Sequence, residues 1–319
     1  MKKSISTALC IVMALSFLAA CSGGGGLIKV GIINNPPGES GYRAANVADF
    51  ESVFTEENGY DAKTFYNDNH NAQINAAREF IDAGVKYLLI SAASSDGWDG
   101  VLTSARDAGV RVFLFDRMIN VSDTLFEAAV ISDMPRQGDM AVRWLKDENL
   151  DVYNVVHIQG ALGTDAQIGR TAALDREFAA GAMHKVIQQS AAWSEEEAKR
   201  IVQGVIESGE PFNVIYAEND GMAAGAVAAL NEAGISHGVN GDVIIIGFDA
   251  NKWALRELLA GNWNYNGQCS PFQASVIDEK IKALEAGGTI TDKIIISEEA
   301  GFDARTITQA DIDRFGLGD

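Results

Sequence analysis

The chain has 319 residues, 47% of them hydrophobic and 22% charged, which is enough for a packed core and for two lobes of ordinary size. Its net charge of −19, from 25 basic and 44 acidic residues, argues against nucleic acid or an anionic lipid surface as a partner. Phosphate binding depends on clustered lysine and arginine, and this composition is instead typical of a soluble acidic protein.

The first element in chain order is a predicted export signal. Lys2 and Lys3 precede the apolar segment 8-ALCIVMALSFLAAC-21, which is short for a membrane span. Its end, 18-LAAC-21, resembles a bacterial lipoprotein signal, in which the cysteine is lipidated. We expect residues 1–20 to be the signal peptide, Cys21 to carry the lipid and 22-SGGGG-26 to be a flexible tether. The alternative is that this segment stays uncleaved as an anchor helix. Because Cys10 leaves with the signal and Cys21 carries the lipid, Cys269 is the one cysteine left, and we expect no intrachain disulfide.

From residue 27 onward, short apolar runs alternate with longer amphipathic stretches. The predicted strands are 27–33, 86–90, 111–115, 127–132, 152–158, 213–217 and 242–248. Apolar residues at three- and four-residue spacing predict helices over 40–57, 72–83, 97–108, 135–148, 195–208, 221–233 and 271–286. Left-handed glycine caps are expected after four of these helices, at Gly84, Gly109, Gly234 and Gly287. The alternation predicts an α/β fold with two doubly wound parallel sheets, in units of about 130 residues.

Polar side chains follow the predicted strands, where open parallel sheets bind their ligands. Acids, an arginine and amides stand there: Asp116, Arg117, Glu218, Asn219, Asp220, Asp249 and Gln268. This mixture suits a sugar, because each sugar hydroxyl both donates and accepts hydrogen bonds. Trp193, just before the helix predicted at 195, offers a face for the C–H side of a sugar ring.

Each of these residues also has a purely structural interpretation. Asn219 or Asp220 is well placed to cap the helix predicted at 221. Asp116 and Arg117 suit a structural ion pair, and Trp193 suits core packing. The sequence alone leaves these alternatives open.

The usual enzyme motifs are missing from the sequence. It contains no Gly-x-Ser-x-Gly elbow, no phosphate-binding Gly-x-x-x-x-Gly-Lys and no dinucleotide glycine fingerprint. The four histidines, at 70, 157, 184 and 237, lack metal-ligand spacing. We therefore expect a protein that is not an enzyme and that holds neither a metal nor a cofactor.

Four stretches carry a resemblance to a known family: 38-GESGYRAA-45, 113-FLFDRMINVSD-123, 217-AENDGMAAGA-226 and 246-IGFD-249. In this order and spacing they resemble the type I periplasmic sugar-binding proteins of ABC transporters, in the ribose- and galactose-binding group, and most closely its galactofuranose-binding branch. The resemblance implies two lobes joined by three crossings, with residues 27–131 plus 269–296 in lobe 1 and 132–268 plus 297–319 in lobe 2. It further implies an extracytoplasmic monomer that closes on one monosaccharide and delivers it to a membrane permease.

The resemblance also implies a set of ligand contacts. In the family pattern, an arginine of the second lobe falls at Ile168 here, which leaves two nearby polar candidates, and the galactofuranose-binding branch has an acid where this chain has an amide at 268. On the sequence, these departures leave the choice among monosaccharides open. The implied contacts are Glu39, Arg43, Asp116, Arg117, Asp165, Arg170, Trp193, Asn219, Asp249 and Gln268.

Other functions remain open on the sequence. A LacI-type repressor shares the core fold, but it needs a helix-turn-helix where this chain has its predicted signal. A sugar-sensing partner of a chemoreceptor or histidine kinase fits the same features, and a secreted hydrolase fits them less well. A non-sugar ligand, such as a small polyol or autoinducer-2, is a further alternative.

Overall fold

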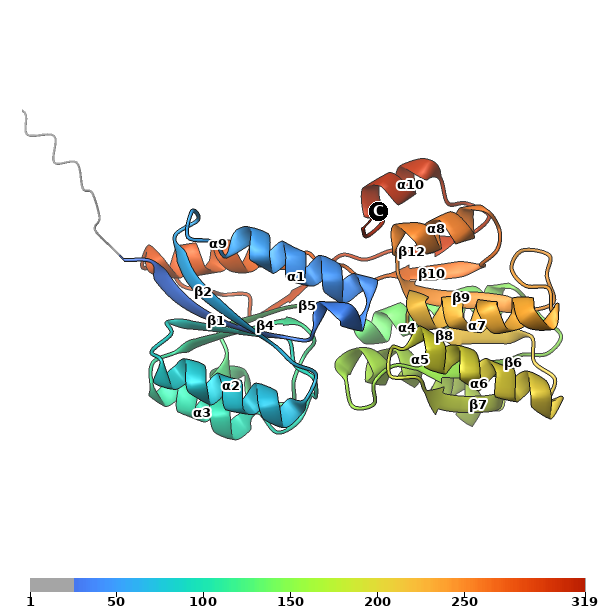
Figure 1. Ribbon diagram of the computed structural model, residues 1–319, viewed down its shortest axis with the longest axis horizontal. Helices are drawn as coiled ribbons and strands as arrows, with labels where there is room; N and C mark the ends of the chain where they lie inside the picture. The colour runs from blue at the N-terminus through green and yellow to red at the C-terminus, as the bar shows by residue number, and fades with distance from the viewer. Residues whose placement is uncertain (1–25, 319) are drawn as a thin grey trace, which may run out of the picture.

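The computed structural model describes residues 26–318 as two α/β lobes that lie side by side (Figure 1). Each lobe is built on a six-stranded sheet with helices packed on both faces, which confirms the predicted doubly wound fold. The predicted signal peptide and Cys21 lie outside the described residues. Within residues 26–318, no helix combines the length and the apolar character that a bilayer crossing requires.

The sheet of lobe 1 is parallel throughout, in the order β11-β5-β4-β3-β1-β2. Its strands are β1 Ile28–Asn34, β2 Tyr60–Tyr66, β3 Tyr87–Ile90, β4 Arg111–Asp116, β5 Ala128–Ile131 and β11 Ile294–Ile296. Helices α1 (Gly41–Val53) and α9 (Ala274–Glu285) cover one face, and α2 (His70–Asp82) and α3 (Asp99–Asp107) cover the other (Figure 1). Short 3-10 turns lie at Pro37–Glu39 and Asp123–Leu125. A separate hydrophobic cluster fills each face.

The sheet of lobe 2 has the order β12-β10-β9-β8-β6-β7, and only β12 in it is antiparallel to its neighbour. Its strands are β6 Asn154–Gln159, β7 His184–Ser190, β8 Val214–Ala217, β9 Ile244–Asp249, β10 Tyr265–Gln268 and β12 Gly301–Asp303. Its helices are α4 Met134–Asp147, α5 Asp165–Ala179, α6 Glu195–Ser208, α7 Asp220–Ala233, α8 Lys252–Leu259 and α10 Gln309–Phe315.

Every predicted strand and helix has its counterpart in the structure, with ends that differ by a few residues. The glycine caps are also confirmed, since Gly84, Gly109, Gly234 and Gly287 have φ values of 71°, 76°, 70° and 83°. The sequence patterns missed the strands β2, β7, β10, β11 and β12 and the helices α5, α8 and α10.

The chain passes between the two sheets three times: after β5, after β10 and again after β11. Backbone hydrogen bonds hold the crossings side by side, from Ser297 N to Ile131 O at 2.9 Å and from Gln268 N to Ala300 O at 2.8 Å. The last residues of β4 and β9, Asp116 and Asp249, border one common cavity. The carboxyl ends of the two sheets therefore face each other.

Candidate ligand-binding site

The site is a small cavity between the lobes, with a volume of about 20 Å³. An outer cleft of about 860 Å³ shares five of its lining residues, namely Glu39, Ser40, Trp193, Asn219 and Asp249. Ligand pockets usually measure about 300–1,000 Å³. The inner cavity alone is therefore too small for a ligand, which needs part of the outer cleft or more space between the lobes. The cavity is lined by Glu39, Ser40, Tyr42, Asp116, Arg117, Met134, Ala166, Arg170, Trp193, Asn219, Asp249 and Cys269.

Asp116 is the centre of the lobe 1 half of the site. Its Oδ1 accepts a hydrogen bond from the Tyr42 hydroxyl at 2.8 Å. Its Oδ2 accepts from Arg43 Nη2 at 2.5 Å and from Ser91 Oγ at 2.8 Å. Arg117 Nε lies 3.5 Å from the same oxygen, which makes a second ion pair. Asp116 and Arg117 thus end β4 in a polar network and not in bulk water.

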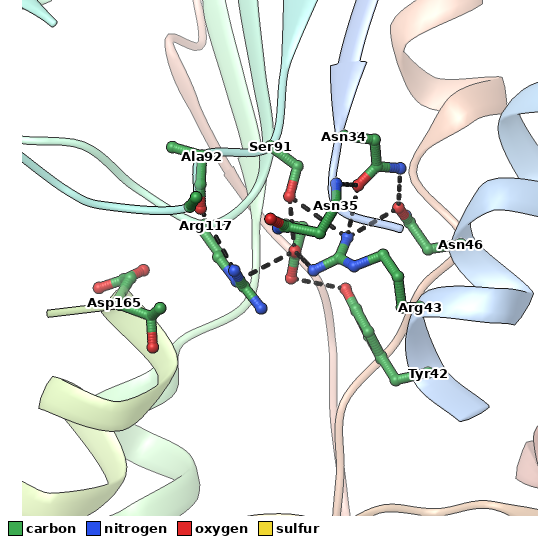
Figure 2. Close-up of polar contacts among 12 residues, drawn as sticks. Asn34, Asn35, Tyr42, Arg43, Asn46, Ser91, Ala92, Arg117 and Asp165 are labelled. Atoms are coloured by element: carbon green, nitrogen blue, oxygen red, sulfur yellow. Dashed lines mark hydrogen bonds and ion pairs between the residues drawn. The ribbon is translucent and has the colours of Figure 1, made fainter. Parts of the chain in front are cut away.

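Arg43 is fully buried and does not line the cavity, and its guanidinium lies among Asn34, Asn46 and Ser91 (Figure 2). It stands in the first turn of α1, where Ser40 caps the helix by accepting from Arg43 N at 3.1 Å. Besides Asp116, its guanidinium donates to Glu39 Oε2 at 3.0 Å and to Asn34 Oδ1 at 2.9 Å, with further bonds to Asn46 and Ser91. Because every nitrogen of the guanidinium has a partner within lobe 1, Arg43 orients Asp116 and Glu39.

Arg117 has spare hydrogen-bonding capacity. It donates to Ala92 O at 3.3 Å and to the Glu39 carboxylate at 3.1 and 3.2 Å. Its Nε is buried and has no hydrogen-bond partner in residues 26–318, because the 3.5 Å approach to Asp116 lacks hydrogen-bond geometry. Buried donors are nearly always satisfied in folded proteins, so this one indicates a place for an acceptor.

Burial and charge oppose each other at the lobe 1 carboxyls. Burial alone would raise the pKa of Asp116, but Arg43 and Arg117 outweigh it and hold the pKa below its usual 3.8. Burial likewise opposes Arg117 and Arg43 at Glu39, and the pKa of this carboxyl also falls below its usual value. Both acids therefore present charged acceptor oxygens at neutral pH.

Arg170 is the centre of the lobe 2 half. Although burial opposes the charge, Asp249 and other acidic neighbours raise its pKa, so it stays a cation. Its Nη2 donates to Asp249 Oδ1 at 3.3 Å, its Nη1 to Glu218 O, and its Nε to Gln137 Oε1 at 2.9 Å. The guanidinium also lies 4.8 Å from the ring centre of Phe248. Burial raises the pKa of Asp249 above its usual 3.8, and Arg170 opposes that shift.

Asn219 confirms one of the structural alternatives, since it is the N-cap of α7 and accepts from Met222 N at 2.8 Å. It also borders the cavity, so capping leaves a ligand contact possible. Asp220 turns away from the cavity and accepts from Asn251 at 2.8 and 2.9 Å and from Asn266 at 2.5 Å.

Trp193 joins the two halves of the site. Its backbone φ is +70°, and its ring packs so closely on Gly160 that an added Cβ there would lie 1.9 Å from the ring. The Arg117 guanidinium lies 6.0 Å from its ring centre, across the gap between the lobes. Trp193 Nε1 is buried without a hydrogen-bond partner in the described chain. The ring is therefore packed and also carries a donor that an acceptor could satisfy.

The structure places three of the predicted contacts away from the cavity wall. Arg43 does not line the cavity, as described above. Asp165, at the start of α5, accepts from Met118 N of lobe 1 at 2.9 Å, and Figure 2 shows it on the opposite side of the gap from Arg43. Gln268 accepts from Ala300 N at 3.1 Å. Ile168 is about half exposed, so Arg170, two residues later, is the arginine that enters the site.

Sequence reasoning missed several residues of the cavity wall, among them Tyr42, Met134 and Cys269. Tyr42 was within reach of sequence reasoning, because it stands directly before Arg43 in the first turn of the helix. Met134 and Cys269 carry no polar signal and lie at crossings between the lobes. Among the described residues, no group of His, Cys, Asp and Glu is arranged to hold a metal ion.

Comparisons with known proteins agree with this architecture. The chain is 30% identical to the galactofuranose-binding protein YtfQ of Escherichia coli over 269 residues, which cover 82% of this chain and 83% of the relative. It is 29% identical to the fructose import binding protein FruE of Bifidobacterium longum, over 93% of both chains. The periplasmic binding protein component of the arabinose ABC transporter from Shewanella, solved with α- and β-L-arabinofuranose, superposes with a TM-score of 0.82 at 27% identity and covers 90% of this chain and 95% of its own.

Residues 28–274 match the family described as the periplasmic binding protein domain. This match spans most of the 319 residues, five of the six strands of each sheet and the whole cavity wall. The chain therefore belongs to the periplasmic binding protein domain family.

Proposed function

We propose that this protein captures one monosaccharide between its lobes. The observation that carries the proposal is the pair of facing half-sites, Asp116 and Arg117 from lobe 1 and Asp249 and Arg170 from lobe 2, at one cavity. Carboxylates accept and guanidiniums donate, so together they match a ring of hydroxyls. Arg117 Nε and Trp193 add two buried donors whose partners a sugar oxygen would supply.

A sugar in its furanose form is the ligand class we favour. Two of the similar proteins bind galactofuranose and L-arabinofuranose, and a third imports fructose. The lobe 1 motif around Arg43 also favours a furanose, because it resembles the galactofuranose-binding branch of the family. We propose a binding protein and not an enzyme, since the matched family and the similar proteins are binding proteins.

Lobe closure is the mechanism we propose for capture. In an open form, each half-site is exposed on its own lobe, and a sugar that touches both halves stabilises the closed form. A micromolar dissociation constant corresponds to about −8 kcal/mol, which several charge-assisted hydrogen bonds and one aromatic contact can supply.

The partners follow from the same proposal. We propose that the closed, sugar-loaded monomer acts on the outer side of the cytoplasmic membrane and delivers its ligand there to the permease of an ABC transporter. We propose in addition that lipid on Cys21 holds the mature protein at a bilayer, with residues 22–26 as a tether.

A tryptophan-fluorescence titration tests the proposal. The purified protein is titrated with D-galactose, L-arabinose, D-fructose and D-ribose, all of which include furanose forms in water. Saturable micromolar binding of at least one sugar is expected, and it should weaken in Asp249→Asn. Asp107→Asn, which changes an exposed carboxylate of lobe 1, is the control and should bind normally. Folded protein that responds to none of the sugars would contradict the proposal.

A further inference from the structure

Glu299 ties the three crossings between the lobes together. Its carboxylate is buried and accepts from Ser132 Oγ at 2.5 Å and from Ser270 N at 2.8 Å. Ser132 lies in the first crossing, Ser270 in the second and Glu299 in the third. One acidic side chain thus connects the three crossing segments at a single point.

Gln137 continues this network toward the cavity. It lies in the first turns of α4 and is 1% exposed. Its Nε2 donates to Glu299 Oε2 at 2.6 Å, and its Oε1 accepts from Arg170 Nε at 2.9 Å. An amide has one donating and one accepting end, whereas an ionised carboxylate only accepts. An ionised Glu299 and the Arg170 guanidinium therefore favour the same orientation of the Gln137 amide.

We propose that Glu299 and Gln137 are positioning residues that set the guanidinium of Arg170 and so couple the crossings to the binding site. Arg170 is held by three acceptors, on Gln137, Glu218 and Asp249. If the first is turned away, the guanidinium loses the bond that fixes its Nε. The effect on sugar affinity rests on the proposed function, whereas the path from Glu299 to Arg170 exists without a ligand.

Glu299→Gln is the first test variant. The new amide keeps its oxygen on Ser132 and Ser270 and turns its NH2 group toward Gln137. The single oxygen of Gln137 then has a donor on both sides, and where it turns to residue 299 its own NH2 group faces Arg170 Nε, which is itself a donor. We expect the Nε–H signal of Arg170 to shift and to exchange faster with water, and sugar affinity to fall about tenfold.

The exchange of the two residues is the decisive variant. In Glu299→Gln with Gln137→Glu, the carboxylate at 137 accepts from both Arg170 and the amide at 299, so each donor has an acceptor again and the charge is unchanged. Gln137→Glu alone places a second carboxylate beside Glu299, where Gln137 Nε2 lies 2.6 Å from Glu299 Oε2 in the wild type. It should be the most disruptive change. The double variant should restore both the Arg170 signal and the affinity to within about threefold of wild type.

The measurement is a 1H–15N spectrum of the arginine Nε–H groups in sugar-free protein, assigned by the signal lost in Arg170→Lys. Ser132→Ala is the matched control, because it removes a donor to Glu299 without reversing Gln137, and its Arg170 signal should stay. Should Glu299→Gln fail to fold, Gln137→Met removes the acceptor directly and is expected to shift the same signal.

An Arg170 signal unchanged in Glu299→Gln and Gln137→Met, or not restored in the double variant, overturns the proposal. Affinity is measured in parallel with D-galactose, L-arabinose and D-fructose. Binding of none of these sugars by wild-type protein counts against the proposed function, and the spectrum still decides the positioning role.

Discussion

Asp116 and Asp249 are the two acids that the sheets contribute to the site, and both end a strand in the same unusual way. Their φ values are +65° and +104°, in the region that non-glycine residues rarely occupy. Such conformations persist where the surrounding contacts hold them, and they concentrate at functional sites. At Asp116 the holding contacts are those from Tyr42, Arg43 and Ser91.

Removal of Arg43 should be severely destabilising. Arg43→Ala leaves Asp116 and Glu39 with much less compensating charge in a buried place, and the loss of one partner of a buried pair typically costs about 3–5 kcal/mol. Urea denaturation measures the change. Arg106→Ala is the control, because its pair with Asp107 is exposed and should contribute less than about 1 kcal/mol. Equal losses in the two variants would show that the buried cluster has no special role.

Acid should weaken the folded state through Asp116. Its pKa in the folded protein is below the usual 3.8, because Arg43 and Arg117 outweigh burial. The unfolded chain therefore binds this proton more tightly, so the stabilisation is complete above about pH 4 and is lost as the pH falls further. The free energy of unfolding, taken from denaturation curves at pH values of roughly 5 to 2, should fall less steeply with acid in Asp116→Asn than in the wild type. Parallel curves for the two proteins would refute this assignment.

At the scale of elements, the site is assembled from strand ends and from the first turns of helices. Asp116 and Asp249 end β4 and β9, while Arg43 and Asn219 stand at the starts of α1 and α7. Because these positions are set by the sheet and by caps, the site forms together with the fold.

Asn219 should have two separable effects. Asn219→Ala removes the cap of α7 and should cost about 1 kcal/mol of stability, and it should also weaken sugar binding, since Asn219 borders the cavity. Asn69→Ala removes the equivalent cap of α2, away from the cavity, and should cost similar stability with unchanged affinity. Thermal unfolding and titration calorimetry separate the two effects. Equal affinity in both variants would reduce Asn219 to a cap.

The elements that sequence patterns found are those whose burial is simple. β3, β4 and β8 are almost wholly apolar and buried, so their runs stand out. β2 and β7 lie at sheet edges and mix exposed with half-buried positions, which hides the period of two. Helix α5 buries Gln167, Arg170 and Thr171 in its polar networks, so its inward face does not look apolar.

The site was predictable to the extent that it follows strand ends. Asp116, Arg117, Asn219 and Asp249 could be found in this way, and the structure places all four at the cavity. Arg43 and Glu39 came from the family resemblance, because nothing in a helix pattern marks a buried arginine. The link from Glu299 to Arg170 joins residues more than a hundred positions apart and depends on packing that no local pattern encodes.

At the scale of the whole molecule, the lobes touch directly beside the site. Ser95 N donates to Gly163 O at 3.2 Å, and Met118 N donates to Asp165 at 2.9 Å. Both bonds run from lobe 1 to the segment around the start of α5. These contacts, with an inner cavity of only about 20 Å³, describe an arrangement in which the lobes lie close together.

Loss of the Asp165 contact should favour opening. Asp165→Ala removes a hydrogen bond between the lobes without touching the cavity wall, so affinity should fall up to about tenfold, mainly through faster dissociation. Stopped-flow fluorescence measures both rates. Asp175→Ala, farther along the same helix and bonded to Gln188 within lobe 2, is the control. A slower association rate with unchanged dissociation would contradict a closing contact.

The central claim is that one sugar bridges two half-sites, and titration calorimetry with one variant from each lobe tests it most directly. The account predicts that Asp116→Asn and Asp249→Asn, both still folded, each weaken binding of the same sugar at least about tenfold, because each replaces an acceptor oxygen on its own side by an amide NH2 group. If either variant bound with wild-type affinity, the ligand would be held by a single lobe, and the account of a bridging sugar would be contradicted.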